Sequence, residues 1–387
     1  MNVLGIGLDY LMLQGDKVRG DVRARQIEYA RMIGRFDLIV YSPKESDLRP
    51  TQLAENLKVI PTNSKNKSSF IIDAWKAASD ICRRGKIDVI TVEDPFTTGL
   101  AGYLLKRRFR IPLNIQVHID FCDNDYWIRQ RRINWFFNKL AKFLLKRADT
   151  IRVGTTKEKS NLAAALGISG NRVFVIPVNC DLSKFTARDG RVIREKYLKG
   201  KFSKMVLFTG RLVPQKDITT LLRAFQIVMK EAPDTLLLII GSGAEEYKLK
   251  KEVETRGMKG NVFFAGSVPH DEIPEYLAAC DVYAVSSIFE GTCIAMVEAM
   301  ASGKPVVVTR FAGTEDLIID GKTGFVVEQK DHGNMAKRIL DVLADPQLSR
   351  VMGEEGRQRV GKMFAGNRNV QSVIDLWKLT ASFGKHG

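Results

Sequence analysis

Short apolar runs that alternate with helical patterns constrain the fold of this chain most. In the N-terminal half, strand-like runs occupy 38–41, 89–92 and 113–117, and helical patterns occupy 69–83 and 99–107. In the C-terminal half, strand-like runs separated by helical patterns occupy 205–210, 235–240, 262–264, 282–285 and 306–308. Uninterrupted apolar strands are typical of parallel sheets that helices cover on both faces. The alternation therefore predicts an α/β fold with mostly parallel sheets.

The length of the chain indicates how these units are grouped. A chain of 387 residues is about twice the length of a common domain. We therefore expect two Rossmann-like, doubly wound domains, the first formed by residues 1–180 and the second by residues 181–366. The last stretch, 367–387, has apolar residues at near-helical spacing. It either ends the second domain or crosses back to the first.

The stretch 287–308 combines two carboxylates with a predicted helix and a buried strand. Thr292 is predicted to cap the helix, and Gly303 is predicted to end it. Glu290 and Glu298 are eight residues apart, and a helical path would separate them by ~12 Å. That distance suits the two ends of a nucleotide sugar better than it suits one metal ion. Taken alone, the pair would more simply be two solvated acids on a surface helix.

The predicted helix also offers a place for a diphosphate between these carboxylates. The N-terminus of a helix has free N–H groups and the positive end of the helix dipole, both of which favour anions. Glu298 would then bind a ribose diol, and Glu290 would bind a hydroxyl group of the sugar.

Four segments in the C-terminal half resemble one enzyme family. FEGTCIAMVEAMASGKPVVV, at 289–308, resembles the Glu-x7-Glu segment of the retaining glycosyltransferase family 4, whose members have the GT-B fold. LFTGRLVPQKD, at 207–217, resembles the family's Gly-Arg-Leu segment, and 309–328 and 176–185 resemble two further family segments. The resemblance implies that the two domains face a central cleft. It also implies a retaining hexosyltransferase that uses a nucleotide-diphosphate-sugar donor.

The resemblance assigns the leaving-group site to Arg211 and Lys216. Breaking the bond between sugar and phosphate leaves negative charge on the diphosphate, so fixed positive groups there lower the barrier. Together with the helix N-terminus these two cations could replace a metal ion. We therefore expect no metal and no cofactor besides the nucleotide sugar, which is a co-substrate. The predicted catalytic and donor-binding residues in this half are Gly210, Arg211, Lys216, Val268, Glu290, Gly291, Thr292, Cys293 and Glu298, with Val268 marking backbone groups near the base.

The N-terminal half offers residues for the acceptor. His118 follows an apolar strand, where the ligand crevice of a parallel sheet lies, and the resembling family often has a His in this place that contacts the donor sugar or the acceptor. Asp120 and Asp123 come next, and Asp123 with Asp125 has the form of an Asp-x-Asp metal motif. Because Arg211 and Lys216 would remove the need for a metal, we interpret these acids as loop or acceptor contacts. The first predicted loop adds Gly15, Asp16 and Gly20, although an ordinary loop explains these equally well.

Charge distinguishes the N-terminal half from the rest of the chain. The net charge of the chain is +16, and most of the excess lies before residue 181. Within that half, 126–148 contains no acid and is predicted to form one helix. Ile133, Phe136, Phe137, Leu140 and Leu144 are predicted to face the core. A second stripe consists of Trp135, Lys139, Lys142 and Lys146, with Arg131 nearby.

An aromatic ring followed by lysines favours the headgroup region of a membrane over a simple solvated face. Three lysines and an arginine would contribute ~4 kcal/mol at an anionic leaflet. The segment therefore predicts an anionic membrane surface as a partner and a lipid-linked or glycolipid saccharide as the acceptor, in cell-surface polysaccharide or glycoconjugate synthesis.

The remaining features set the compartment and the alternatives. MNVLGIGLDYLML lacks a basic stretch and a cleavage site, and no apolar run reaches the ~20 residues of a membrane span, so we expect the cytoplasmic face of the membrane. The five cysteines form no C-x-x-C pair, which indicates neither disulfides nor zinc. One alternative is a GT-B enzyme of other chemistry, such as an epimerase or a phosphorylase. Another is a basic, non-catalytic nucleic-acid-binding protein, but no nucleic-acid motif accompanies the basic residues, so we expect no specific nucleic acid.

Overall fold

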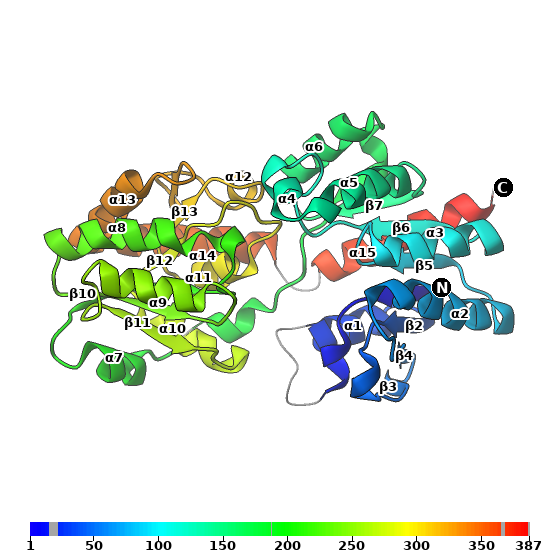
Figure 1. The fold of residues 1–387 in the computed structure, drawn as a ribbon, viewed down its shortest axis with the longest axis horizontal. Helices are drawn as coiled ribbons and strands as arrows, with labels where there is room; N and C mark the ends of the chain where they lie inside the picture. Colours follow the sequence, from blue (N-terminus) through cyan, green and yellow to red (C-terminus); the bar gives the residue numbers. More distant parts are fainter. Residues whose placement is uncertain (15–21, 187, 365–367, 386–387) are drawn as a thin grey trace. The chain divides into compact units, whose positions relative to one another are not determined.

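The computed structural model describes residues 1–14, 22–186, 188–364 and 368–385. Its contacts divide the chain into two compact units, each described by itself below. Unit 1 consists of Met1–Asn179 and Asn367–Gly387, and unit 2 consists of Cys180–Gly366 (Figure 1). Each unit contains one sheet with helices, so the predicted α/β fold with two parallel-sheet domains is confirmed.

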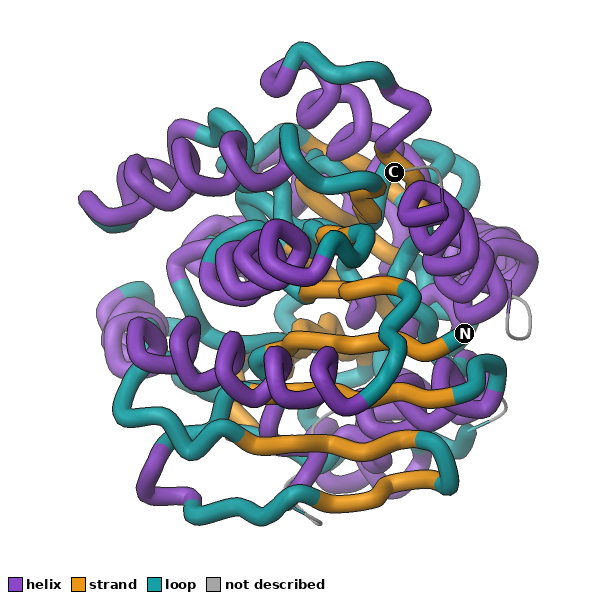
Figure 2. The backbone as a smooth tube through the Cα atoms, turned by 90° about the vertical axis from the view of Figure 1, so that its right-hand side faces the viewer, coloured by secondary structure: helices purple, strands orange, loops and turns teal. Residues whose placement is uncertain are grey.

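Unit 1 contains a sheet of eight strands in the order β3-β4-β2-β1-β5-β6-β7-β8. All neighbouring strands are parallel except β3, which pairs antiparallel with β4. The strands are β1 (Asn2–Gly7), β2 (Arg35–Val40), β3 (Thr51–Ala54), β4 (Leu57–Pro61), β5 (Val89–Val92), β6 (Leu113–Gln116), β7 (Thr150–Val153) and β8 (Val173–Val175). The helices are α1 (Val22–Arg31), α2 (Lys67–Arg84), α3 (Thr97–Phe109), α4 (Asp125–Gln130), α5 (Arg132–Leu145), α6 (Thr156–Leu166) and α15 (Arg368–Ser382). Figure 2 shows strands running side by side with helices packed along them.

The last helix of the chain, α15, packs in the core of unit 1. Trp377 is almost fully buried, and its ring contacts the rings of Tyr29 and Phe36 at centroid distances of 5.4 and 5.5 Å. Val370, Val373 and Ile374 of the same helix join this core, which also includes residues of α1, β1, β2 and β4. The chain therefore leaves unit 1 after Asn179 and returns to it through α15.

Unit 2 contains a parallel sheet of six strands in the order β11-β10-β9-β12-β13-β14. The strands are β9 (Lys204–Thr209), β10 (Thr235–Ile240), β11 (Val262–Gly266), β12 (Val282–Val285), β13 (Val306–Thr309) and β14 (Phe325–Val327). The helices are α7 (Arg191–Leu198), α8 (Ile218–Glu231), α9 (Glu246–Thr255), α10 (Ile273–Ala279), α11 (Ile294–Ala301), α12 (Thr314–Leu317), α13 (His332–Ala344) and α14 (Pro346–Met363).

The four central strands of unit 2, β10, β9, β12 and β13, are buried on both faces, as their uninterrupted apolar sequences predict. In β9, Met205 and Leu207 belong to one core, whereas Val206 and Phe208 belong to the other. The first core is completed by α7, α10 and α11, and the second by α8, α9 and α13. Successive side chains of a strand point to opposite faces, so one apolar run serves two layers of helices.

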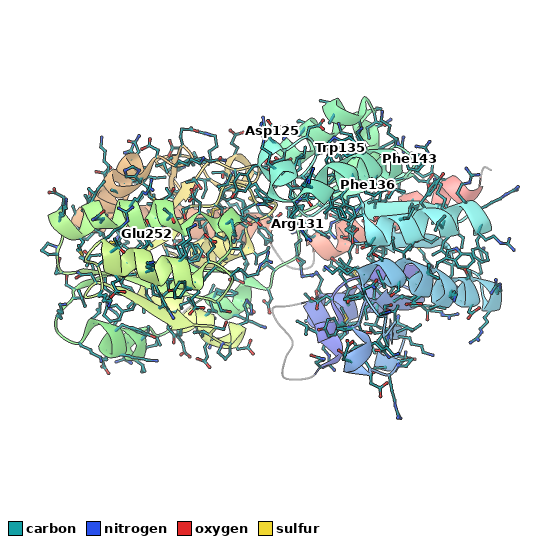
Figure 3. The ribbon with its side chains drawn as sticks, viewed as in Figure 1. Asp125, Arg131, Trp135, Phe136, Phe143 and Glu252 are labelled. Carbon is teal, nitrogen blue, oxygen red and sulfur yellow. The ribbon has the colours of Figure 1, made fainter. Side chains whose placement is uncertain are left out.

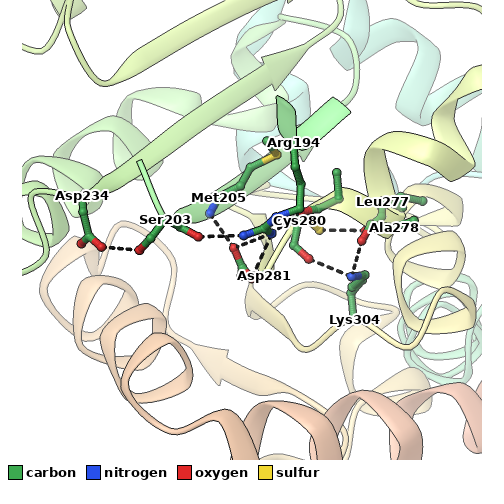
Figure 4. A network of polar contacts seen from close by, with 10 residues as sticks. Arg194, Ser203, Met205, Asp234, Leu277, Ala278, Cys280, Asp281 and Lys304 are labelled. Atoms are coloured by element: carbon green, nitrogen blue, oxygen red, sulfur yellow. Dashed lines mark hydrogen bonds and ion pairs between the residues drawn. The ribbon is translucent and has the colours of Figure 1, made fainter. Parts of the chain in front are cut away.

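A polar network ties together the amino ends of the strands in unit 2 (Figure 4). Arg194 of α7 donates to the carbonyl oxygens of Ala279 and Ser203, each at 2.7 Å, and pairs with Asp281 at 3.2 Å. Asp281 accepts a hydrogen bond from the backbone N–H of Met205 at 2.7 Å. Because Asp281 directly precedes β12 and Met205 lies in β9, the network fixes the spacing of two central strands at one edge of the sheet.

The opposite edge of this sheet has a topological switch point. The chain builds β9, β10 and β11 in one direction, and then returns to place β12 on the other side of β9. The loops that follow β9 and β12 therefore leave the carboxyl ends of two neighbouring strands in opposite directions. In open parallel sheets ligands bind at this place.

Candidate active site

The loops after β9 and β12 are joined by several hydrogen bonds. The loop after β9 contains a short 3-10 helix, η6 (Pro214–Lys216). Ile288 donates its backbone N–H to the carbonyl of Gln215 at 2.9 Å, and Gln215 donates its side-chain amide to the carbonyl of Phe289 at 2.8 Å. The hydroxyl of Ser286 donates to the carbonyl of Lys216 at 2.9 Å. These bonds hold η6 against the segment that contains Glu290.

Lys216 and Glu290 form an ion pair across these two loops. The ammonium Nζ of Lys216 lies 2.6 Å from Oε1 of Glu290, and the two side chains are only 13% and 12% exposed. Burial alone would lower the pKa of Lys216, but the neighbouring Cys293 and Glu290 more than offset this effect and raise it. Lys216 is therefore a cation at neutral pH. The structure brings together two residues that lie 74 positions apart in the sequence.

Arg211 supplies a second positive charge at the same place. It lies in the same loop after β9 and is exposed, and its positive charge opposes the rise in the pKa of Lys216. Gly210, just before it, has a φ of 155° and lies against Gly241, where a Cβ atom would stand 1.9 Å from the carbonyl oxygen of Gly210. Two cations beside one carboxylate leave a net positive charge, which favours an anionic ligand.

The helix that follows, α11, begins later than the sequence predicted. Its N-cap is Cys293, without a side-chain hydrogen bond, so the assignment of Thr292 as the cap is wrong. Gly291 is buried and Thr292 half-buried in the loop before the helix. Gly303 does end the helix, with a φ of 69° and its N–H donating to the carbonyl of Met300 at 2.9 Å.

Two details of this segment change the chemistry expected from it. Glu290 lies in the loop before α11 rather than on a continuous helix, so the predicted helical path from Glu290 to Glu298 is also wrong. Burial, reinforced by the charge of Glu290, raises the pKa of the Cys293 thiol to about 12. Cys293 is therefore a neutral, buried group at the first turn of α11 and not a nucleophile.

Glu298 has a partner that the sequence did not indicate. Its carboxylate Oε1 lies 2.8 Å from Nε2 of His270, and Glu298 is only 5% exposed. His270 begins the 3-10 helix η7 (His270–Glu272), shortly after the half-buried Val268 in the loop that follows β11. The contact joins residues 28 positions apart on different elements, so neither spacing nor periodicity could have shown it.

The acceptor residues predicted for unit 1 occupy separate places. His118 is exposed two residues after β6, and it lines a small cavity whose walls also include Glu93 and Arg152. Burial raises the pKa of Glu93, and its Oε2 accepts a hydrogen bond from the N–H of Leu8 at 3.0 Å. Glu93 was missed because it follows β5 without any recognisable motif. Gly15, Asp16 and Gly20 lie outside the described residues.

The aspartates after His118 differ in their surroundings. Burial raises the pKa of Asp120, which lies beside the amide of Asn161. Asp123 pairs with Lys142 at 2.6 Å and accepts a hydrogen bond from Asn138 at 3.0 Å, contacts that lower its pKa. Asp125 is mostly exposed at the start of α4 (Figure 3). Within 1–14, 22–186, 188–364 and 368–385, no three His, Cys, Asp or Glu side chains are grouped closely enough to hold a metal ion.

The basic segment differs from the prediction in three respects. It is broken at Arg131 into α4 and α5, where the side chain of Asn134 donates to the carbonyl of Trp127 at 2.7 Å. Lys142 is not part of an open basic face, because it pairs with Asp123. The buried residues of α5 are Asn134, Asn138, Ala141, Leu144 and Leu145, so the prediction is confirmed for Leu144 alone, while Phe137 and Leu140 are half-buried.

Because α5 turns a different face toward the core than the sequence predicted, two residues that were predicted to be buried are exposed. Ile133 and Phe136 are 49% and 56% exposed, and Trp135 and Phe143 of the same helix are 55% and 43% exposed. Figure 3 labels Trp135, Phe136 and Phe143. Basic residues lie over two of these rings: Lys139 of α5 lies 3.8 Å above the ring of Trp135, and Arg147, just after α5, lies 3.6 Å above that of Phe143. We call Ile133, Trp135, Phe136 and Phe143 the apolar ridge of α5. No helix in the described part of the chain is long and apolar enough to span a membrane.

Two family models match the chain. The model "Glycosyltransferase Family 4" matches residues 29–184, and "Glycosyl transferases group 1" matches residues 189–359. HepE from Anabaena, solved in complex with UDP, has 18% sequence identity and a TM-score of 0.79 over 98% of this chain and 100% of its own. This likeness shows the same two-domain fold.

Two curated relatives give the range of similar proteins. A GDP-mannose-dependent alpha-(1-6)-phosphatidylinositol monomannoside mannosyltransferase of Mycolicibacterium smegmatis is 32% identical over 58% of this chain, and the match spans only 62% of the relative's length. A UDP-Gal:alpha-D-GlcNAc-diphosphoundecaprenol alpha-1,3-galactosyltransferase of Escherichia coli is 25% identical over 82% of each chain.

The ion pair of Lys216 and Glu290 predicts a specific effect on stability. Glu290→Gln leaves the ammonium of Lys216 buried without its counter-charge, which typically costs ~3–5 kcal/mol. The double variant Lys216→Met, Glu290→Gln should recover most of this loss. Denaturant unfolding of the full chain measures both. As a matched control, Glu246→Gln removes the exposed pair with Lys250 and should cost below ~1 kcal/mol. Equal losses for Glu290→Gln and Glu246→Gln would contradict the importance of burial.

Proposed function

Because the chain belongs to the family 4 type of glycosyltransferases with the GT-B fold, we propose that it transfers a sugar from a nucleoside-diphosphate-sugar to a saccharide acceptor. The observation that carries this proposal is the ion pair of Lys216 and Glu290 at the switch point of unit 2, with Arg211 exposed beside it. The reaction retains the anomeric configuration, as the resemblance of the Glu290 to Glu298 segment implies.

The leaving group determines what these cations do. As the sugar leaves, negative charge grows on the diphosphate, and preorganised positive groups stabilise that charge without a cost in reorganisation. Arg211 grips two oxygens of the diphosphate and Lys216 acts as a point charge. The first turn of α11, after Gly291 and Thr292, adds free N–H groups. With these groups in place the reaction requires no divalent metal.

The carboxylates bind the two ends of the donor. Glu290 contacts the hydroxyl groups of the sugar, and Glu298 binds the ribose diol. Backbone groups near Val268 contact the base. The mycobacterial relative is named for GDP-mannose and the Escherichia coli relative for UDP-galactose, while HepE was solved with UDP. These names support a nucleoside diphosphate as the common part of the donor.

The acceptor of this chain is a saccharide attached to a lipid. The names of both relatives contain a lipid-linked acceptor, phosphatidylinositol monomannoside in one and diphosphoundecaprenol in the other. The apolar ridge of α5 supports the same proposal, because exposed aromatic residues next to basic ones are favoured at a headgroup boundary. Unit 1 attaches to the cytoplasmic face of an anionic membrane and receives the acceptor there. His118 and Asp120 then lie on the acceptor side of the reaction.

The catalytic proposal predicts transfer without metal and a strong dependence on Lys216. Labelled UDP- and GDP-hexoses are offered with undecaprenyl-diphosphate-linked and phosphatidylinositol-linked saccharides, always in excess EDTA. Wild type should transfer the sugar, and Lys216→Ala should be slower by ~10² to 10³, as is typical for the loss of one preorganised charged group. Lys250→Ala, an exposed lysine of the same unit, is the control. Transfer that appears only when magnesium or manganese is added would contradict the metal-free site, and full activity of Lys216→Ala would contradict its role.

From the proposed membrane contact we predict that the apolar ridge contributes as much to the free energy of membrane binding as the basic residues do. Burying four half-exposed apolar side chains is worth roughly 3–6 kcal/mol, similar to the ~3 kcal/mol from the three exposed basic residues Arg131, Lys139 and Lys146 at an anionic leaflet. Wild type should therefore sediment with anionic vesicles, and Trp135→Ser, Phe136→Ser should remain in solution.

The control for this experiment replaces two apolar residues that are even more exposed, in unit 2. Val192 and Tyr247 of unit 2 are 71% and 80% exposed, and Val192→Ser, Tyr247→Ser should sediment like wild type. If the variant of the ridge sedimented as well as the control, the ridge would not be the contact with the membrane.

A further inference from the structure

His270 and Glu298 form a contact within unit 2 that the proposed reaction does not yet explain. Nε2 of His270 lies 2.8 Å from Oε1 of Glu298. An ionised carboxylate can accept hydrogen bonds but cannot donate them, so with Glu298 ionised it is Nε2 of His270 that donates in this contact. We propose that His270 is a positioning residue that orients the Glu298 carboxylate toward the ribose hydroxyls and thereby sets the preference for ribose over deoxyribose. This inference rests on the proposed function, in which Glu298 binds the ribose of the donor.

The carboxylate needs such a partner because of where it lies. Glu298 is on α11, and its side chain is 7% exposed. A carboxylate that is nearly removed from water is costly unless it accepts hydrogen bonds. The torsion that turns a Glu carboxylate about its last bond is soft, so packing alone leaves its plane poorly fixed. The bond to His270 fixes Oε1 and so orients Oε2, which can then accept from a hydroxyl of the ribose.

His270 is itself held from a second direction. The ring of Phe185 meets the ring of His270 edge to face at 5.9 Å, and Phe185 is almost fully buried. Phe185 ends the 3-10 helix η5 (Leu182–Phe185), which also packs against α11. Lys184 of η5 lies 3.6 Å from Asp271, the residue after His270. The imidazole is therefore wedged between a buried aromatic ring and the carboxylate that it orients.

The side chain of His270 remains accessible from solvent, at 25% exposure, whereas Glu298 is not. This difference matches a site in which a ligand enters beside the imidazole and reaches the carboxylate last. A residue that acts only through Glu298 should affect a ligand only as far as that ligand uses Glu298. In the proposed donor site Glu298 meets the ribose, whose hydroxyl groups donate hydrogen bonds that a carboxylate accepts.

Calorimetry on the full chain tests this coupling with pairs of ligands. UDP, GDP, ADP and CDP are titrated into wild type, and the tightest binder is then compared with its 2′-deoxy counterpart. The same two ligands are titrated into His270→Ala and His270→Gln. His332→Ala, an exposed histidine at the start of α13, is the matched control. Melting temperatures without ligand verify that each variant is folded.

The expected result is a loss of discrimination. A hydrogen bond to a charged group corresponds to about tenfold in affinity, so wild type should bind the ribonucleotide about tenfold more tightly than the deoxynucleotide. His270→Ala should weaken the ribonucleotide about tenfold and leave the deoxynucleotide unchanged. His270→Gln, which keeps a side-chain N–H donor, should restore most of the preference, and His332→Ala should match wild type.

Three other results would overturn the inference. If His270→Ala weakened both ligands equally, His270 would support the loop rather than orient Glu298. If His270→Ala discriminated as well as wild type, the contact would have no role in binding. If wild type bound none of the four nucleoside diphosphates, the proposed function would fail as well, which distinguishes that failure from the first two.

Discussion

The candidate active site of unit 2 depends on the ion pair of Lys216 and Glu290. This pair joins the loop after β9 to the loop after β12, and it does so where the strand order reverses. The sheet topology brings the two loops together, and the hydrogen bonds of Gln215 and Ser286 fix them there. The pair also keeps a lysine charged in a place that is nearly closed to water. In the proposed reaction the ammonium of Lys216 is thus already oriented before the diphosphate binds, and such preorganisation is the condition for electrostatic catalysis.

The amino ends and the carboxyl ends of the strands in unit 2 differ in how their polar groups are bonded. At the amino ends of the strands, Arg194 and Asp281 saturate backbone groups and leave no open charge (Figure 4). At the carboxyl ends, Arg211 stays exposed and Glu298 accepts its hydrogen bond from a partly exposed histidine. Polar groups that are fully satisfied rigidify a fold, whereas groups with capacity to spare can bind a ligand. The fully bonded amino ends of the strands therefore support the carboxyl ends, where we propose that the ligand binds.

Features could be predicted from the sequence where the residues next to them in the chain form a recognisable pattern. Buried strands could be recognised because their apolar runs have no interruption. Lys216 and Glu290 were singled out because their segments resemble those of a glycosyltransferase family, and their roles in the reaction stay predictions. Strand β7 was missed because it contains a buried arginine, Arg152, whose charge is met by Gln116 and by the carbonyl of Ile176. A local pattern cannot reveal partners that come from other strands.

The errors on α5 have a similar origin. The side chain of Asn134 satisfies the end of α4, so a helix starts anew at Arg132 and its buried face contains asparagines. Periodicity assigned that face to the largest apolar residues, Ile133 and Phe136, which are instead exposed. His270 could not be found at all, since its importance arises only from the carboxylate that it meets across the fold.

We propose that the switch point of unit 2 binds the diphosphate of a nucleotide through Lys216 and Arg211. Thermal unfolding with and without UDP or GDP tests it most directly, because a ligand at 100 times its dissociation constant stabilises the folded state by ~2.7 kcal/mol. We expect at least one of these nucleotides to raise the melting temperature of wild type, and we expect no such increase for Lys216→Ala. An unchanged melting temperature for wild type, or an equal increase for Lys216→Ala, would contradict the claim.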